Sequence, residues 1–197
     1  MEKKHLPQRI IGHLKTVYQH RSLVRSYCMQ CGLYWQGWTH DLSKYSLCEL
    51  IPSIRFYQGW RSPYAYEKQL YGYSSGWLHH KGVNKHHWEY WYDTIDGKWQ
   101  PVAMPDRYVI ESMCDRLAAC RVYRKADYTP QDALLYFRHT QAPMHAETAR
   151  ILEHLLKMIA EQGEKETFQT IRRLRKKHLP LSTLLSSELK NQNGSSQ

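Results

Sequence analysis

The adjacent residues His40 and Asp41 carry the sharpest chemical signal in the sequence, and Ser43 and Lys44 follow them closely. An imidazole nitrogen and a carboxylate oxygen are both ligands for divalent transition metals. At the start of a helix the two neighbouring side chains can turn toward one ion. A His-Asp pair also occurs by chance in many proteins, so other residues must support the metal hypothesis.

A histidine earlier in the chain supports it. His20 falls on the same face of a predicted helix as Val17 and Val24, so its side chain is expected to point toward the core. We interpret His20 as a further metal ligand, because the His40-Asp41 pair follows it in the chain. His13 lies two turns earlier on nearly the same face, and a packed core histidine explains it equally well.

The segment from residue 76 to residue 91 is the densest in histidine. If it is helical, His80, Asn84 and His87 share one face of that helix. Packing alone is a poor explanation for so many histidines, so we interpret His80 and His87 as candidate metal ligands. His79 and His86 fall on another face, and we expect them to be exposed to solvent.

Two carboxylates lie four residues apart on a later predicted helix, at Glu111 and Asp115. Like charges at this spacing repel each other unless a cation or an arginine lies between them. The small residues Ala118 and Ala119 leave room for an ion to approach. Asp115 is therefore a candidate ligand, and a surface pair neutralised by neighbouring arginines is the alternative.

The elements that must position these residues are almost all helices. Apolar residues recur at helical spacing, and proline, glycine and capping signals mark the boundaries. Ser46 and Glu49 form a capping-box signal. Asp96-Gly97 signals a turn before an irregular or hairpin segment. We expect helices over 10–31, 47–57, 79–91, 105–123 and 143–163, a short helix that begins at 130, and a last helix that ends at 178. Between them we expect a connector over 33–39 and a surface loop over 59–76.

The composition is that of a folded domain. The chain has 197 residues, of which 42% are hydrophobic and 13% aromatic, enough to build a core and too many for a disordered chain. It lacks an apolar run long enough to span a membrane and a secretory signal at its start. We expect a single compact all-α domain over 1–188, a cytoplasmic location and a disordered polar tail over 189–197. The five cysteines are expected to be reduced, with Cys28 and Cys31 in the core.

The charge favours anionic partners. Lys and Arg total 28 against 18 Asp and Glu, which gives a net charge of +10. A run of arginines and lysines over 172–177 is interpreted as a solvated helix end. We expect a small anionic substrate, such as a nucleotide, and no membrane partner. Nucleic acid is a less favoured partner, because the sequence lacks a zinc-finger or recognition-helix motif. The oligomeric state is left open.

The order of these residues resembles that of the HD-domain metal-dependent phosphohydrolases. A first-helix His, a His-Asp pair, further histidines and a late Asp all occur in sequence. More narrowly, the chain resembles a largely uncharacterised bacterial and phage family of unknown function. An HDxSKFS-like stretch begins at His40, with Tyr45 in place of Phe, and an NxHHWEYW-like stretch begins at Asn84. Met104-Pro105 and Met144-His145 also fit, whereas Asp115-Arg116 replaces the Asp-Trp usual in that family.

The resemblance implies an HD-domain-like helical bundle that holds one or two divalent ions of Mn, Fe, Co, Ni or Zn. The implied ligands are His20, His40, Asp41 and Asp115, with His80 and His87 for a second ion. Such ions lower the pKa of a water molecule, and the resulting hydroxide attacks the phosphorus of a phosphate ester.

Further residues are expected to assist this reaction. Lys44, with Arg21 and Lys81, would neutralise the phosphate. Asn84 and Trp88 would contact the substrate, and stacking of a base on Trp88 is one way to do so. His145 either donates a proton to the leaving group or caps its helix.

Two other functions stay open on sequence alone. The same six ligands would suit an HD-type di-iron oxygenase, since imidazole and carboxylate bind iron, manganese, cobalt, nickel and zinc alike. A non-catalytic protein that binds a nucleotide or nucleic acid is the third possibility.

Overall fold

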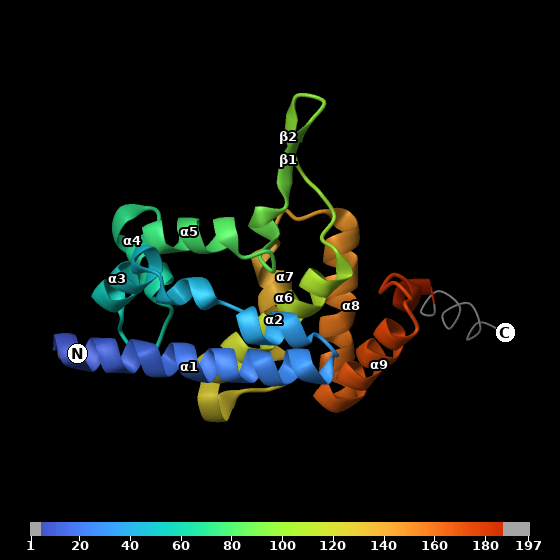
Figure 1. Cartoon of the computed structure of the whole chain (residues 1–197), viewed down its shortest axis with the longest axis horizontal. Coiled ribbons are helices and arrows are strands. Elements are labelled where there is room, and N and C mark those ends of the chain that lie inside the picture. Colours follow the sequence, from blue (N-terminus) through green and yellow to red (C-terminus); the bar gives the residue numbers. More distant parts are fainter. Residues whose placement is uncertain (1–4, 187–197) are drawn as a thin grey trace.

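The long helix α1 (Leu6–Gln30) lies along one side of the molecule, and the remaining helices pack on it or on one another (Figure 1). The structure is a computed structural model that describes residues 5–186. The other elements are α2 (Tyr34–Thr39), α3 (Leu47–Phe56), α4 (Pro63–Tyr71), α5 (Ser75–Val83), β1 (Tyr92–Ile95), β2 (Lys98–Pro101), α6 (Asp106–Arg124), α7 (Asp132–Thr140), α8 (Ala146–Gln162) and α9 (Glu164–Lys176), with short 3₁₀ helices at Leu42–Tyr45, Trp88–Tyr90 and Lys125–Asp127.

The core forms around α6, which packs against α1, α7 and α8. The apolar positions expected on α6 and α8 are buried: Ile110, Met113, Cys114, Leu117, Ile151, Leu152, Leu155, Leu156 and Ile159. Cys28 and Cys31 are buried as expected, and all five cysteines are free. The all-α class is therefore confirmed, and burial of these apolar stripes stabilises the arrangement.

Helix boundaries follow the sequence signals at several points. Gly32, with φ of 80°, follows the end of α1, and Gly163, with φ of 88°, separates α8 from α9. Positive φ is a conformation that glycine adopts without steric cost, so both glycines stop a helix. α1 begins four residues earlier than residue 10, and α7 begins at Asp132 rather than at residue 130.

The loop expected over residues 59–76 is wrong, because α4 occupies much of it. Pro63 stands in the first turn of α4, where its missing N–H costs nothing, and Gly72 ends the helix with φ of 79°. Tyr64 and Glu67 are buried on its inner face. The connector expected over 33–39 forms α2, and at Gly37 a Cβ atom would lie 3.2 Å from the carbonyl oxygen of Arg25 on α1.

The helix expected over 79–91 is also wrong in its extent. α5 ends at Val83, and the following Asn84 is extended, with its side-chain Nδ2 donating to the carbonyl of His80 at 2.8 Å. An asparagine that caps the last turn in this way terminates a helix. His87 therefore does not share a helical face with His80, and the chain turns back on itself instead.

β1 and β2 form an antiparallel hairpin that projects from the helical body (Figure 1). Ile95 pairs with Lys98, and both turn residues, Asp96 and Gly97, have positive φ, of 52° and 72°. This is the geometry that an Asp-Gly turn favours in a hairpin. The turn signal is therefore confirmed. The tail expected over 189–197 lies outside the described residues.

Within residues 5–186, no helix is both long enough and apolar enough to cross a membrane.

Two glycines on α5 give a matched test of how this helix packs. At Gly76 a Cβ atom would lie 2.8 Å from a ring carbon of Tyr64 and 3.3 Å from Pro52, whereas at Gly82 it would meet nothing within 4 Å. Gly76→Ala is expected to destabilise the protein by about 1 to 3 kcal/mol through overpacking. Gly82→Ala is expected to stabilise it by about 0.5 kcal/mol through helix propensity. Urea unfolding measures both, and an equal effect of the two substitutions would contradict this packing.

Candidate metal centre

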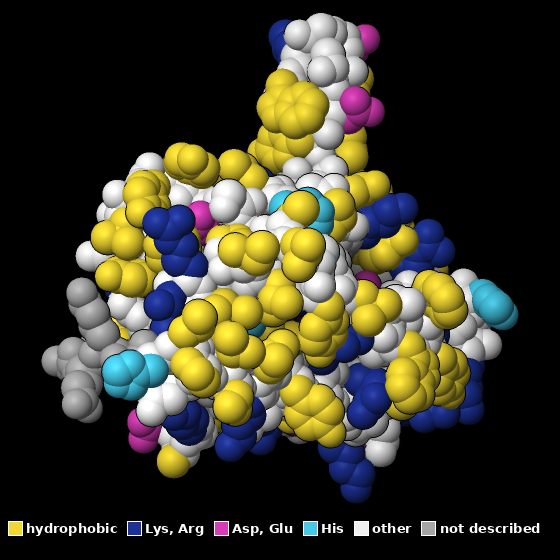
Figure 2. Space-filling view, turned by 60° about the vertical axis from the view of Figure 1, so that its left-hand side comes forward, with side chains coloured by type: hydrophobic (Ala, Val, Ile, Leu, Met, Phe, Trp, Pro, Cys, Tyr) yellow, Lys and Arg dark blue, Asp and Glu magenta, His cyan; other side chains and the backbone are white. Residues whose placement is uncertain are grey.

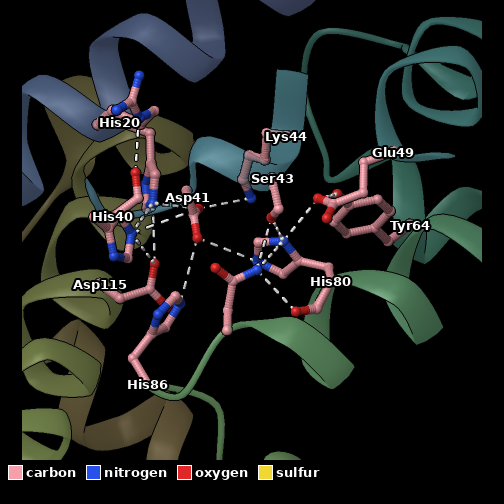
Figure 3. Close-up of polar contacts among 12 residues, drawn as sticks. His20, His40, Asp41, Ser43, Lys44, Glu49, Tyr64, His80, His86 and Asp115 are labelled. Carbon is pink, nitrogen blue, oxygen red and sulfur yellow. Dashed lines mark hydrogen bonds and ion pairs between the residues drawn. The ribbon is translucent and has the colours of Figure 1, made fainter. Parts of the chain in front are cut away.

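Asp41 lies at the centre of a buried cluster of histidines and carboxylates (Figure 3). Its two carboxylate oxygens face different partners. Oδ2 lies 3.6 Å from Nε2 of His20 and 3.5 Å from Nε2 of His40, while Oδ1 lies 3.4 Å from Nε2 of both His80 and His86. The backbone of Asp41 is left-handed, with φ of 54°, a conformation that costs free energy in a non-glycine residue.

The first donor set gathers around Oδ2 of Asp41. His20 comes from α1, His40 and Asp41 follow α2, and Asp115 comes from α6; one ligand atom of each lies within 4.8 Å of the others. Oδ1 of Asp115 is 3.0 Å from Nε2 of His20 and 3.5 Å from Nε2 of His40. The structure thus brings together the four residues that the sequence nominated for one ion.

The second donor set gathers around Oδ1 of Asp41 and contains His80, His86 and His87, again with ligand atoms within 4.8 Å of one another. The three imidazole rings are close neighbours, with centroids of His86 and His87 4.1 Å apart and those of His80 and His87 4.7 Å apart. A smaller group, His40, His86 and Glu111, overlaps both sets. Asp41 is the residue that the two four-membered sets share.

Carboxylates behind the cluster orient three of the histidines. Oε1 of Glu111 lies 2.9 Å from Nδ1 of His40 and 3.3 Å from Nδ1 of His86, and Oε2 of Glu49 lies 2.7 Å from Nδ1 of His80. An ionised carboxylate only accepts hydrogen bonds, so each Nδ1 donates. Each Nε2, the nitrogen nearest Asp41, is then free to act as a ligand, as in the carboxylate–histidine pairs of metal sites.

The electrostatics keep the carboxylates ionised. Burial alone would raise the pKa of Asp41, but His40, Lys44 and the other histidines hold it well below its usual range. Burial would also raise the pKa of Asp115, and His20 and His40 hold it well below the usual value. Burial alone would lower the pKa of His40, yet the surrounding carboxylates raise it well above normal. The carboxylates therefore stay ionised at neutral pH, and a metal ion would take the place of the proton that they hold on His40.

Buried polar atoms without partners show how well a metal would fit. Among residues 5–186, Nε2 of His86, Nε2 of His87 and Oδ1 of Asp41 are buried and have no hydrogen-bond partner, whereas Oδ2 of Asp41 has Nζ of Lys44 at 3.0 Å. Such atoms normally cost about 1–3 kcal/mol each when left unsatisfied. All the donors are nitrogen or oxygen, which suits divalent transition metals such as Mn, Fe, Co, Ni and Zn. These clusters could therefore hold a metal ion.

The sequence analysis did not identify three residues of this buried cluster as part of the site. His86 was expected to be exposed, and this is wrong: it is 1% exposed and contacts Asp41 and Glu111. Glu111 is buried against histidines and not neutralised by arginines at the surface. Its spacing from Asp115 was the one signal that could have found it.

Glu49 is the third, and its capping-box interpretation is wrong. Ser46 makes no side-chain cap, and Glu49 instead turns inward, where it contacts His79 at 2.8 Å and accepts a hydrogen bond from Tyr64 at 3.0 Å. Burial alone would raise the pKa of Glu49, but its bond with His80 and the other polar contacts lower it to about 2. The partly exposed His79 is therefore tied to this carboxylate and does not stand free in solvent.

Three of the residues expected to act on substrate lie beside the donor sets. Nζ of Lys44 is 3.0 Å from Oδ2 of Asp41. Nε of Arg21 donates to the carbonyl of His40 at 2.8 Å, so this guanidinium holds the backbone of the ligand pair. Nδ2 of Asn84 donates to Oγ of Ser43 at 2.7 Å.

The other expected residues have different surroundings. Lys81 is half-buried and acts electrostatically on Glu89. Trp88 packs against the hydrophobic core and Tyr92. His145 caps α8, with Nδ1 accepting from the N–H of Glu147 at 3.3 Å. His13 is buried against Tyr57, and burial, with a smaller effect of Lys44, lowers its pKa to about 4, as for a neutral core histidine.

The chain belongs to a family of unknown function, DUF5662, whose family model matches residues 9–158. This range contains every member of both donor sets. No curated protein and no solved structure matches the chain. The resemblance to an uncharacterised family is thus confirmed.

Glu111 offers a test of how the histidines are oriented. Glu111→Gln leaves the ligand atoms in place but removes the charged acceptor behind His40 and His86, so metal affinity is expected to fall about 10- to 100-fold. Titration of metal-free protein with Zn²⁺ or Mn²⁺ in a competition assay with a chelating dye measures this. Glu147→Gln, at an exposed position, is the control, and its metal affinity should equal that of the wild-type protein. Equal affinity of both variants would contradict the assigned role of Glu111.

Proposed function

We propose that this protein is a metal-dependent phosphohydrolase that uses two divalent transition-metal ions to activate a water molecule against a phosphate ester. The observation that carries the proposal is the carboxylate of Asp41, whose two oxygens each face a separate set of histidines. A carboxylate shared by two metal sites is suited to phosphoryl transfer, in which two ions stabilise the attacking and leaving oxygens. The resemblance of the motif order to HD-domain phosphohydrolases supports the same reaction class.

Seven residues would hold the ions. His20, His40 and Asp115 would bind one ion and His80, His86 and His87 the other, with Asp41 between them. When bound, the ions would lower the pKa of water and neutralise charge on phosphate oxygens. This set differs from the sequence hypothesis by the addition of His86.

The side chain of Lys44 would bind the phosphate. Burial alone would lower the pKa of its ammonium group, but Asp41 and the other anionic groups nearby raise it, so that the group stays charged. A compact ammonium ion beside the metal ligands can hold a phosphate oxygen and stabilise the charge that develops on it during the reaction. Because its ammonium group is positively charged, Lys44 is the side chain that we expect to contact the anionic substrate.

The substrate class follows from charge. The chain carries a net charge of +10, which attracts small anions such as nucleotides. Five free cysteines suit a reducing compartment, so we place the reaction in the cytoplasm.

A second candidate function is oxidation at a di-iron centre. The histidine-rich, carboxylate-bridged donor set favours it, because such donors also bind iron. Product formation that requires iron and oxygen would support the oxygenase. Phosphate release without oxygen, with Mn²⁺ or Co²⁺, would support the hydrolase.

Lys44 separates phosphate binding from metal binding. Lys44→Met removes a positive charge next to the donor sets, so metal content should stay the same or rise. The kcat/KM for phosphate esters is expected to fall about a hundredfold, as on loss of one charge-stabilising group. Release of phosphate from p-nitrophenyl phosphate and from a panel of nucleotides measures this, and Lys98→Met on the exposed hairpin is the control.

Unchanged turnover in Lys44→Met would remove Lys44 from the reaction. If the metal-loaded wild-type protein releases no phosphate from any of these esters, the hydrolase proposal as a whole is contradicted. A binding protein would then be favoured.

A further inference from the structure

Two segments of the chain contain no acidic residue. Between Glu2 and Asp41 the sequence has no Asp or Glu, and the same holds for residues 167–187. The first segment forms α1 and α2, and the second contains most of α9. Its basic residues include Arg172, Arg173, Arg175, Lys176 and Lys177. The Lys and Arg side chains of both segments are therefore not balanced by acidic residues within the same segment, although the chain has acidic groups elsewhere.

The fold places these two segments side by side. Nη2 of Arg175 donates to the carbonyl of Gly32 at 3.3 Å, and Nη2 of Arg172 donates to the hydroxyl of Tyr34 at 3.1 Å. α9 thus packs at the junction between α1 and α2, as Figure 1 also shows. Figure 2 shows Lys and Arg side chains along the lower part of the molecule, interspersed with hydrophobic side chains and with few acidic ones.

Aromatic rings are exposed at this junction. Tyr34 is 57% exposed, Trp35 76% and Trp38 58%. The guanidinium of Arg25 lies over the ring of Trp38, 4.8 Å from its centroid. Trp35 and Trp38 are three residues apart on α2, so they lie on neighbouring positions of one helical face. Exposed aromatic rings next to guanidinium groups offer flat surfaces on which further planar groups can stack.

We propose that this α2–α9 surface, made of Tyr34, Trp35, Trp38, Arg25, Arg172 and Arg175, binds single-stranded nucleic acid. Unpaired bases would stack on the tryptophan rings, and the arginines would contact the phosphates. Proteins that bind single strands combine exposed aromatic rings with a cationic surface in this way. Bases in a duplex are already stacked on each other, so the surface selects single strands. None of the metal ligands belongs to it, so this binding does not depend on the proposed hydrolase activity.

The tryptophans provide the first test. Binding of a fluorescein-labelled oligothymidine is measured by fluorescence anisotropy in the presence of EDTA, which removes any contribution of bound metal. The double variant Trp35→Ala/Trp38→Ala is expected to bind at least about tenfold more weakly, because each lost ring removes a stacked base. Trp99→Ala on the hairpin, where the side chain is 69% exposed, is the matched control and should bind normally.

The arginines provide a second test on another helix. Binding should weaken with salt, and Arg172→Gln should reduce the slope of log affinity against log salt concentration by about 0.7, the value for one phosphate contact on a single strand. Lys98→Gln on the exposed hairpin is the control for lost charge. Urea unfolding of each variant shows whether the fold is preserved.

Several results would overturn the proposal. An abasic oligodeoxynucleotide that binds as tightly as oligothymidine would show that the bases make no contact. Polyglutamate that competes equally well would indicate an acidic protein as the partner. Equal weakening by Trp99→Ala and by the double variant, or no weakening by either, would exclude the α2–α9 surface.

Discussion

The arrangement depends on one buried carboxylate. Both oxygens of Asp41 are buried, Oδ1 has no hydrogen-bond partner within residues 5–186, and the backbone adopts a left-handed conformation. An ionised carboxylate in such a place is stable only with positive charge close by. Lys44 supplies one such charge, and the histidines from α1, α5 and the segment after α5 could supply ligand atoms for a cation. Residues from α1, α5 and α6 are thereby brought together in one buried cluster.

The carboxylates that orient the histidines are as important for the site as the candidate ligands themselves. Glu111 on α6 and Glu49 on α3 accept hydrogen bonds from the Nδ1 atoms of the histidines and leave Nε2 directed at the centre. Each carboxylate is buried, and its helix is held by neighbouring elements: α6 packs on α1, α7 and α8 in the core, and α3 packs on α1, α4 and α5. The packed helices fix the positions of the two carboxylates, and the carboxylates fix the orientation of the imidazole rings, as a metal ligand requires.

Some of this could be predicted from the sequence, because periodicity determines which side chains face the core. That argument placed His20 inward on α1 and identified the buried faces of α6 and α8. It failed where tertiary contacts override local signals. Asn84 ends α5 early and lets the chain bring His86 back to Asp41, which helical spacing could not anticipate. Glu49 fits a capping box locally, but two histidines and a tyrosine draw it into the interior.

The most direct test of the central claim is the metal content of the protein, purified without a histidine tag and measured by inductively coupled plasma mass spectrometry. The two proposed sites, which share Asp41, predict two equivalents of a divalent transition metal per chain. They also predict that Asp41→Asn, with its fold intact by circular dichroism, loses both. A chain that retains no metal after loading with Mn, Fe, Co, Ni or Zn would contradict the account. So would an Asp41→Asn variant with undiminished metal content.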